Sequence, residues 1–266
     1  MHQIFFKTEC LTRYTLSRLL KRVHETELPY FLLKFIITTF EKLYNVNSSE
    51  FEEREYKSFS DYFTRELKDL KKQRPIGNGL ISPVDATGIK TQYFEENKEI
   101  KVKSTTTSLQ DFTGFDLNDS DFFAIHFYLS PKDYHRVHCP LKSISINDAT
   151  YIEGHRLMIE KLDATFLTQN ERVCFELKNQ DDITFYLVMT GAFCVGNIYF
   201  NGTKTILNHS NIKEVIGYNF KQFDEIGRFA FGSSISLILP RQFFRSSDLV
   251  DSKRSIFLGE TIGDVL

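Results

Sequence analysis

The sequence predicts an α+β fold in which amphipathic helices at the N-terminus precede a mainly antiparallel β core. Up to about residue 75, apolar side chains recur with helical spacing. From about residue 80 onward, short runs rich in β-branched and aromatic residues alternate with turn signals. A chain of 266 residues can bury a sizeable core, and we find no internal repeat or obvious linker.

The composition limits the classes of function. A net charge of −2 argues against broad nucleic-acid binding, because such proteins need a basic patch to neutralise phosphates. The four cysteines form no C-x-x-C pair and fit a reducing compartment. The first residues lack the pattern of a signal peptide, and the most apolar stretch, 29–40, is too short to span a bilayer. We therefore expect a protein that is not integral to a membrane.

Residues 11–46 are predicted to form two amphipathic helices separated by Pro29. The first has an apolar stripe of Leu16, Leu19, Leu20 and Val23. Its basic side is formed by Arg13, Arg18, Lys21 and Arg22. The second carries an apolar stripe of Phe31, Leu32, Phe35, Ile36 and Phe40. Such helices can lie in a membrane interface or pack on the core, and the pattern alone favours packing.

The charged stretch 47–75 also has helical character. Ser58 or Ser60 could cap a helix whose inward side carries Tyr62, Phe63 and Leu67 and which ends at Arg74-Pro75. Beyond it, apolar runs at 122–129, 183–193, 195–200 and 234–240 predict strands.

The last of these runs is preceded by Gly232-Ser233-Ser234. A glycine followed by two hydroxyl residues rarely begins a strand unless a turn or a close backbone approach is needed. The pattern therefore allows two interpretations, a turn before an ordinary strand or a nucleophilic Ser233.

The segment "YLSPKDYHRVHCP", residues 128–140, is the most unusual cluster of chemically active side chains. His135 and His138 stand three residues apart after turn-forming residues, so the two imidazoles could converge. A metal site would need further ligands, and the candidates form no recognised spacing: His126, His155 and Asp133. A metal site is therefore disfavoured.

Asp85 lies in "ISPVDATG", residues 81–88, where an aspartate bonding to its own turn is the simpler interpretation. With a histidine and Ser233 it could also complete a nucleophile, a base and an orienting carboxylate. The usual nucleophile motif G-x-S-x-G is missing. Composition and spacing lead only to a possible Ser/His/Asp site.

Six segments, in order along the chain, resemble the pyruvoyl-dependent phosphatidylserine decarboxylases. They are "FSDYFTRELKDLKKQRPI", "SPVDATG", "YLSPKDYHRVHCP", "FLTQNERV", "TGAFCVGNI" and "GRFAFGSS". The third is similar to the family's long histidine-containing signature nearly letter for letter. The departures are Ala86 for the usual Gly, Phe231 where Leu is common, Ser234 for the commoner Thr, and a stretch in which only Gly154 is kept of a Pro-Gly pair.

The resemblance implies that Asp85, His138 and Ser233 form a self-processing triad. It implies cleavage between Gly232 and Ser233 into a β chain, 1–232, and an α chain, 233–266. Ser233 would become a covalent pyruvoyl group that forms a Schiff base with the substrate, and His135 would assist decarboxylation. No metal or added coenzyme is implied.

The implied activity is conversion of phosphatidylserine in a membrane into phosphatidylethanolamine and CO₂. Residues 1–48 would then be a helical membrane-associating region and residues 49–266 the catalytic domain. We expect a peripheral protein on the cytoplasmic face of a bacterial inner membrane, built as a heterodimer of its α and β chains, with a higher oligomer allowed. Three alternatives stay open: a Ser/His/Asp ester hydrolase without chain cleavage, a non-catalytic lipid-binding relative, and a pyruvoyl enzyme acting on a soluble amino acid.

Overall fold

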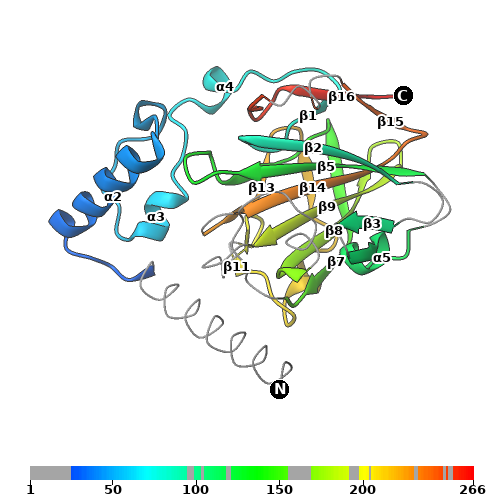
Figure 1. The fold of residues 1–266 in the computed structure, drawn as a ribbon, viewed down its shortest axis with the longest axis horizontal. Helices are drawn as coiled ribbons and strands as arrows, with labels where there is room; N and C mark the ends of the chain where they lie inside the picture. Colours follow the sequence, from blue (N-terminus) through cyan, green and yellow to red (C-terminus); the bar gives the residue numbers. More distant parts are fainter. Residues whose placement is uncertain are drawn as a thin grey trace.

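The fold is known from a computed structural model of the whole chain (Figure 1). It describes residues 25–94, 99–102, 105–117, 121–154, 169–191, 198–203, 205–230, 233–247, 250 and 254–266. The predicted basic helix of residues 11–24 lies outside the described residues, as do His155, Phe231 and Gly232.

Two N-terminal helices lie beside the β core, on the left in Figure 1. Helix α2, Tyr30–Tyr44, follows Pro29 and ends at Asn45, which adopts a left-handed φ of 52°. Helix α3, Phe59–Phe63, begins at Ser58, whose side chain accepts a hydrogen bond from Asp61 N. The two helices pack through an apolar cluster of Leu33, Phe40, Phe59, Tyr62 and Phe63. No helix among the described residues is long and apolar enough to cross a membrane.

The expectation of a long helix within 47–75 is wrong. The stretch instead contains a 3₁₀ turn, α3 and a second short helix: η1, Ser48–Glu50; α3; and α4, Leu70–Gln73. Between the last two the chain is not helical, and a β-bridge joins Phe51 to Leu67. Tertiary contacts therefore override the local helical pattern, although Ser58 does cap a helix and the three predicted inward residues are buried.

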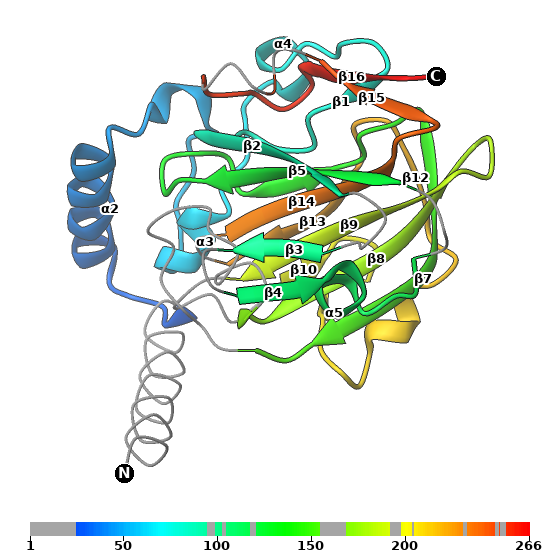
Figure 2. The ribbon, with the colours of Figure 1, turned by 45° about the vertical axis from the view of Figure 1, so that its right-hand side comes forward.

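A seven-stranded antiparallel sheet forms the centre of the molecule (Figure 2). Its spatial order is β12, Asn219–Lys221; β7, Ser143–Ile152; β8, Arg172–Asn179; β9, Thr184–Gly191; β14, Ser233–Pro240; β5, Phe122–Leu129; and β2, Gly88–Phe94. The α+β class and the predicted strand 122–129 are thereby confirmed.

Smaller sheets surround the large one. One has the order β11, Thr205–Ile206; β10, Ile198–Phe200; β13, Glu225–Phe229; and β6, Arg136–His138. Another has the order β1, Leu80–Ile81; β16, Thr261–Val265; and β15, Phe244–Ser246. The remaining elements are the hairpin β3–β4, Glu99–Val102 and Thr105–Ser108; α5, Leu109–Thr113; and η2, Ile212–Val215.

Strand β14 is covered on both faces. Its eight residues are all buried, and β9 and β5 pair with it on either side. One face of the large sheet packs on the sheet that contains β10, where the rings of Phe175 and Phe200 lie 6.3 Å apart. The other face lies under α5, where the Phe112 ring approaches that of His126 at 6.4 Å. The apolar and hydroxyl sides of β14 are therefore both interior.

Candidate active site

Ser233 is the first residue of β14. It pairs with Leu129 of β5 and with Gly191 of β9, so the backbone there is held on both edges. Its hydroxyl is buried and has no hydrogen-bond partner among the residues that the structure describes. Such a group is costly to bury. Because successive side chains alternate across a sheet, Ser233 and Ser234 point to opposite faces.

His135 precedes strand β6 and is buried. Its Nδ1 lies 2.8 Å from the carbonyl oxygen of Asp133. A carbonyl can only accept, so Nδ1 carries the proton and Nε2 has the lone pair. Nε2 is buried and has no hydrogen-bond partner within the described part of the chain. The ring of Phe63 packs on the imidazole at a centroid distance of 4.2 Å.

The turn before His135 is held by the carboxylate of Asp133. This carboxylate accepts hydrogen bonds from Ser130 N at 2.7 Å, from Thr87 N at 3.1 Å and from Thr87 Oγ1 at 2.8 Å. Burial raises the pKa of Asp133, and these donors act in the opposite direction. The turn is therefore tied to the segment that carries Asp85.

His138 ends strand β6 and has different partners. Its Nδ1 donates to the carbonyl oxygen of Phe223 at 2.7 Å, and its Nε2 lies 3.3 Å from the hydroxyl of Tyr134. Phe223 has a left-handed φ of 75°, which is uncommon for an aromatic residue. The Phe223 carbonyl fixes the His138 tautomer, so Nε2 is the basic nitrogen. Burial lowers the pKa of His138.

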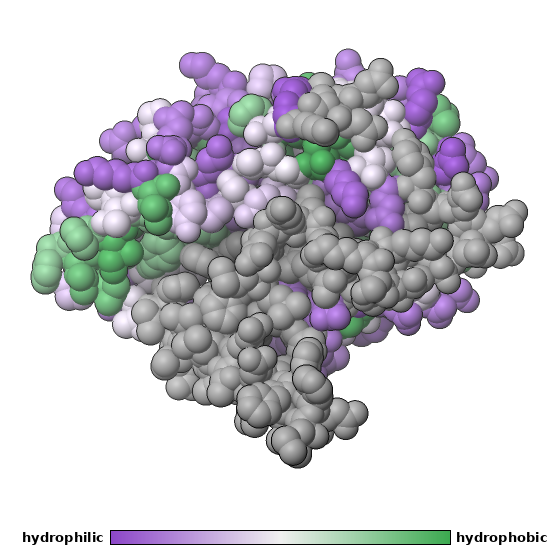
Figure 3. Space-filling model, viewed as in Figure 1, coloured by the Kyte–Doolittle hydropathy of each residue, from purple (hydrophilic) through white to green (hydrophobic). Residues whose placement is uncertain are grey.

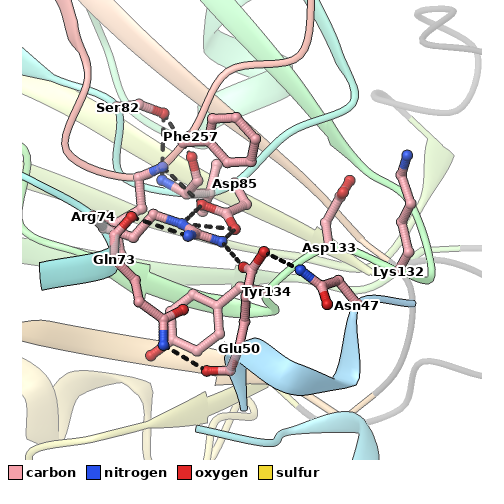
Figure 4. Close-up of polar contacts among 12 residues, drawn as sticks. Asn47, Glu50, Gln73, Arg74, Ser82, Asp85, Lys132, Asp133, Tyr134 and Phe257 are labelled. Carbon is pink, nitrogen blue, oxygen red and sulfur yellow. Dashed lines mark hydrogen bonds and ion pairs between the residues drawn. The ribbon is translucent and has the colours of Figure 1, made fainter. Parts of the chain in front are cut away.

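Asp85 is bound by Arg74 from the N-terminal segment (Figure 4). Arg74 Nε lies 2.9 Å from Oδ1 and Arg74 Nη2 lies 2.7 Å from Oδ2, a bidentate pair. Leu258 N donates to Oδ1 at 2.8 Å, and Glu50 Oε2 accepts from the same Arg74 Nη2 at 2.8 Å. Burial disfavours the charged form of Arg74 and so acts to lower its pKa. The hydrogen bonds to Asp85 and the negative charge of Asp85 outweigh this effect and raise the pKa of Arg74.

The structure brings Asp85 and His138 into neighbouring segments without a hydrogen bond between their side chains, and Ser233 pairs with β5 and β9. His138 N donates to Pro83 O at 2.9 Å, two residues before Asp85. Yet the hydrogen bonds of Asp85 go to Arg74 and Leu258, and the His138 Nδ1 proton goes to Phe223. The negative charge of Asp85 acts on His138 at longer range and favours its protonated form.

Several residues of this site were not singled out from the sequence. Arg74 was interpreted only as a helix end, and Asp133 as part of a turn or a weak metal candidate. Charged residues are mostly exposed, so nothing in the sequence indicated that these two side chains are buried in the site. The Phe223 carbonyl gave no sequence signal because a backbone oxygen exists at every position. His126, another weak metal candidate, bonds Ser236 Oγ at 2.7 Å within the large sheet.

Comparisons with known proteins point to one family. A family model described as phosphatidylserine decarboxylase matches residues 59–264. The chain is similar to the phosphatidylserine decarboxylase proenzyme of Helicobacter pylori (strain Shi470), with 32% identity over 265 residues that cover 94% of this chain and 96% of the relative. It is also similar to the proenzyme of that name from Campylobacter jejuni, with 32% identity over 93% of this chain and 97% of the relative. That of Hahella chejuensis is 28% identical over 99% of this chain and 94% of the relative.

Two buried histidines predict a loss of stability in acid. Burial lowers the pKa of His126 and of His135 to about 3. An unfolded histidine titrates near 6.5, so between these values the unfolded chain binds more protons than the folded one. The free energy of unfolding should therefore fall by about 2 kcal/mol per histidine between about pH 7 and about pH 5. Urea denaturation at the two pH values measures this loss.

Two variants isolate the contribution of one imidazole. His126→Gln should remove about 2 kcal/mol of the difference between the two pH values, because glutamine does not titrate. The exposed His209→Gln should leave the difference unchanged. An equal pH dependence in His126→Gln and in the unaltered protein would contradict the assignment.

Proposed function

The chain belongs to the phosphatidylserine decarboxylase family, and from this premise we propose that it converts phosphatidylserine into phosphatidylethanolamine and CO₂. We further propose that it does so with a pyruvoyl group made from its own Ser233. The observation that carries the proposal is the family match, which spans Asp85, His135, His138 and Ser233. As a decarboxylase the protein is a carboxy-lyase.

The surroundings of Ser233 fit a pyruvoyl group. The Ser233 hydroxyl is a buried donor without a partner among the described residues, and conversion to a ketone removes that donor. Residue 233 also begins β14, so a chain end placed there stays held between β5 and β9. When present, the group supplies an electron sink for the carbanion that forms as CO₂ leaves.

Formation of the group begins with His138 acting as a base. Its Nε2 removes the Ser233 hydroxyl proton, and the oxygen attacks the carbonyl carbon of Gly232. The peptide C–N bond breaks and an ester takes its place, with the proton passing to the new amine. A base then takes the Cα proton of residue 233 while the Cβ–O bond breaks, so that the Gly232 carboxylate leaves and residue 233 becomes a dehydroalanine end. One water hydrolyses its imine form, ammonia leaves, and the ketone remains.

The role of Asp85 differs from that of a directly bonded triad member. Its charge favours the imidazolium of His138 once the proton has moved, without a hydrogen bond between the two side chains. Arg74 and the Leu258 amide hold the carboxylate in place during this step. We therefore propose Asp85 as an electrostatic support for His138.

The same contacts would retain the C-terminal fragment after cleavage. Strand β14 stays inserted between β9 and β5, and β16 stays paired with β1. Leu258 N binds Asp85, and a β-bridge joins Ala86 to Ile256. Fragments 1–232 and 233–266 would thus form a tightly bound heterodimer.

We propose that His135 moves a proton during decarboxylation. The substrate amine arrives as an ammonium ion and must lose a proton before its nitrogen can react. The free lone pair on His135 Nε2 can accept this proton and return it to the carbon that CO₂ has left. Burial keeps the imidazole neutral beforehand by lowering its pKa to about 3.

Helix α2 would bring the protein to the bilayer. Phe31 and Phe35 are 76% and 70% exposed, and Figure 3 shows hydrophobic residues gathered over this helix. The opposite side of α2 packs on α3 through Phe40, and α3 in turn contacts His135 through Phe63. A bilayer against α2 would therefore lie beside the site, where a membrane lipid can enter.

Of the two adjacent serines, only the hydroxyl of Ser233 is predicted to be needed for cleavage. The unaltered protein should run as two chains on a denaturing gel, and Ser233→Ala as one, because alanine has no nucleophile. Ser234→Ala, whose side chain faces the other side of the sheet, should still give two chains. Two chains from Ser233→Ala would refute the processing step. An uncut wild-type chain labelled by a fluorophosphonate at Ser233 would support an ester hydrolase instead.

Membrane binding is predicted to depend on the exposed face of α2. The double variant Phe31→Ser, Phe35→Ser should bind phosphatidylglycerol–phosphatidylcholine vesicles at least about tenfold more weakly, because two phenyl groups no longer enter the interface. Ile216→Ser serves as the control, since Ile216 is 41% exposed on the turn after η2. Co-sedimentation measures both variants. Unchanged binding of the double variant would show that α2 is not the membrane contact.

A further inference from the structure

Arg65 is a buried cation without a carboxylate partner among the described residues. The residue is only 1% exposed. Its guanidinium carbon lies 4.2 Å from the centroid of the Phe51 ring and 5.0 Å from that of the Tyr62 ring. Nη2 donates to Lys132 O at 2.9 Å, while Nε and Nη1 have no acceptor in the described part of the chain. An unpaired buried charge is costly, so a residue with a structural role alone would be better apolar.

The one strong hydrogen bond of Arg65 reaches the turn that carries His135. Lys132 is in this turn, and the carbonyl of Asp133, the next residue, holds His135 Nδ1. From the other side, the Asp133 carboxylate binds Thr87 and fixes the same turn. Two residues before Arg65, the Phe63 ring packs on the imidazole.

We propose that Arg65 is a positioning residue for the decarboxylation step, which fixes the Ser130–Tyr134 turn and thereby the direction in which His135 Nε2 points. The inference rests on the proposed function, because His135 acts only in that reaction. Catalytic groups must be held within a fraction of an ångström, and a misplacement of about 1 Å can cost about a hundredfold in rate.

The charge of Arg65 has a second effect on the same imidazole. Burial is the main cause of the low pKa of His135, and the positive charge of Arg65 lowers it further, against the bond to the Asp133 carbonyl. The lower pKa keeps the imidazole neutral at rest but makes Nε2 a weaker base, so this charge does not itself help the proton transfer. What Arg65 contributes to the reaction is therefore the direction in which Nε2 points.

A direct role for Arg65 in holding the lipid phosphate fits the geometry less well. The guanidinium is enclosed by Phe51 and Tyr62 and is almost inaccessible. Phosphate binding would appear mainly in KM, whereas positioning appears in kcat. Self-cleavage should be spared in either case, because the main anchors of His138, Pro83 O and Phe223 O, lie outside the turn and only its longer contact of 3.3 Å with the Tyr134 hydroxyl involves the turn.

The experiment compares Arg65→Met, Arg65→Lys and the unaltered protein. Methionine fills a similar volume without the charge, and such replacements of buried ions are often neutral for stability. Arg54→Met is the matched control, since Arg54 lies over the ring of Tyr56 at 4.5 Å but is more exposed and paired with Asp61. For each protein, cleavage is measured on a denaturing gel, and kcat and KM by CO₂ release from phosphatidylserine in detergent micelles.

We expect full cleavage in all four proteins, and for Arg65→Met a kcat lowered about ten- to a hundredfold with KM changed less than about threefold. The kcat of Arg65→Lys should lie between those of Arg65→Met and the unaltered protein. The kcat and KM of Arg54→Met should match those of the unaltered protein. An unchanged kcat, a rise confined to KM, or loss of cleavage in both Arg65 variants would overturn the inference. Absence of CO₂ release from the cleaved, unaltered protein would instead refute the proposed function.

Discussion

The insertion of β14 between β9 and β5 is the constraint on which the rest of the structure depends. Both edges of this strand are hydrogen-bonded and all eight of its residues are buried. The first residue, Ser233, is therefore fixed in a water-poor interior, where its hydroxyl finds no hydrogen-bond partner within the part of the chain that the structure describes. A strand held in this way can lose its covalent link to the preceding residues and remain in place, because its backbone hydrogen bonds and buried side chains are retained.

The N-terminal segment completes the site with two buried arginines. Arg74 forms a bidentate pair with Asp85, and Arg65 reaches the turn before His135. Burying an ion pair is favourable only with good hydrogen-bond geometry. Arg74 forms such a pair with Asp85, whereas Arg65 has no carboxylate partner among the described residues. The two histidines are consequently supported by different groups, His138 by the Asp85 neighbourhood and Phe223, and His135 by the turn that Arg65 and Asp133 hold. Cleavage and decarboxylation could thus be altered independently.

The sequence predicts the strands better than the contacts of the site. The run 122–129 coincides with β5 because a short stretch rich in aromatic and apolar residues is a local property of the sequence. The helix expected within 47–75 is broken, because the pairing of Phe51 with Leu67 and the burial of Arg65 depend on distant segments. The expected site residues came from the resemblance of three segments: "YLSPKDYHRVHCP" for the two histidines, "SPVDATG" for Asp85 and "GRFAFGSS" for Ser233. Their partners, Arg74 for Asp85 and the Phe223 carbonyl for His138, follow from the folded chain and not from spacing.

The central claim is that Ser233 is consumed to make the end of a second chain, and intact mass under denaturing conditions tests it most directly. Protein that elutes as one species in native buffer should separate into two masses. One should correspond to residues 1–232 and the other to residues 233–266 with a ketone in place of the terminal amine. A single mass for the uncut chain of 266 residues, or a C-terminal fragment that keeps an ordinary serine amine, would contradict the account.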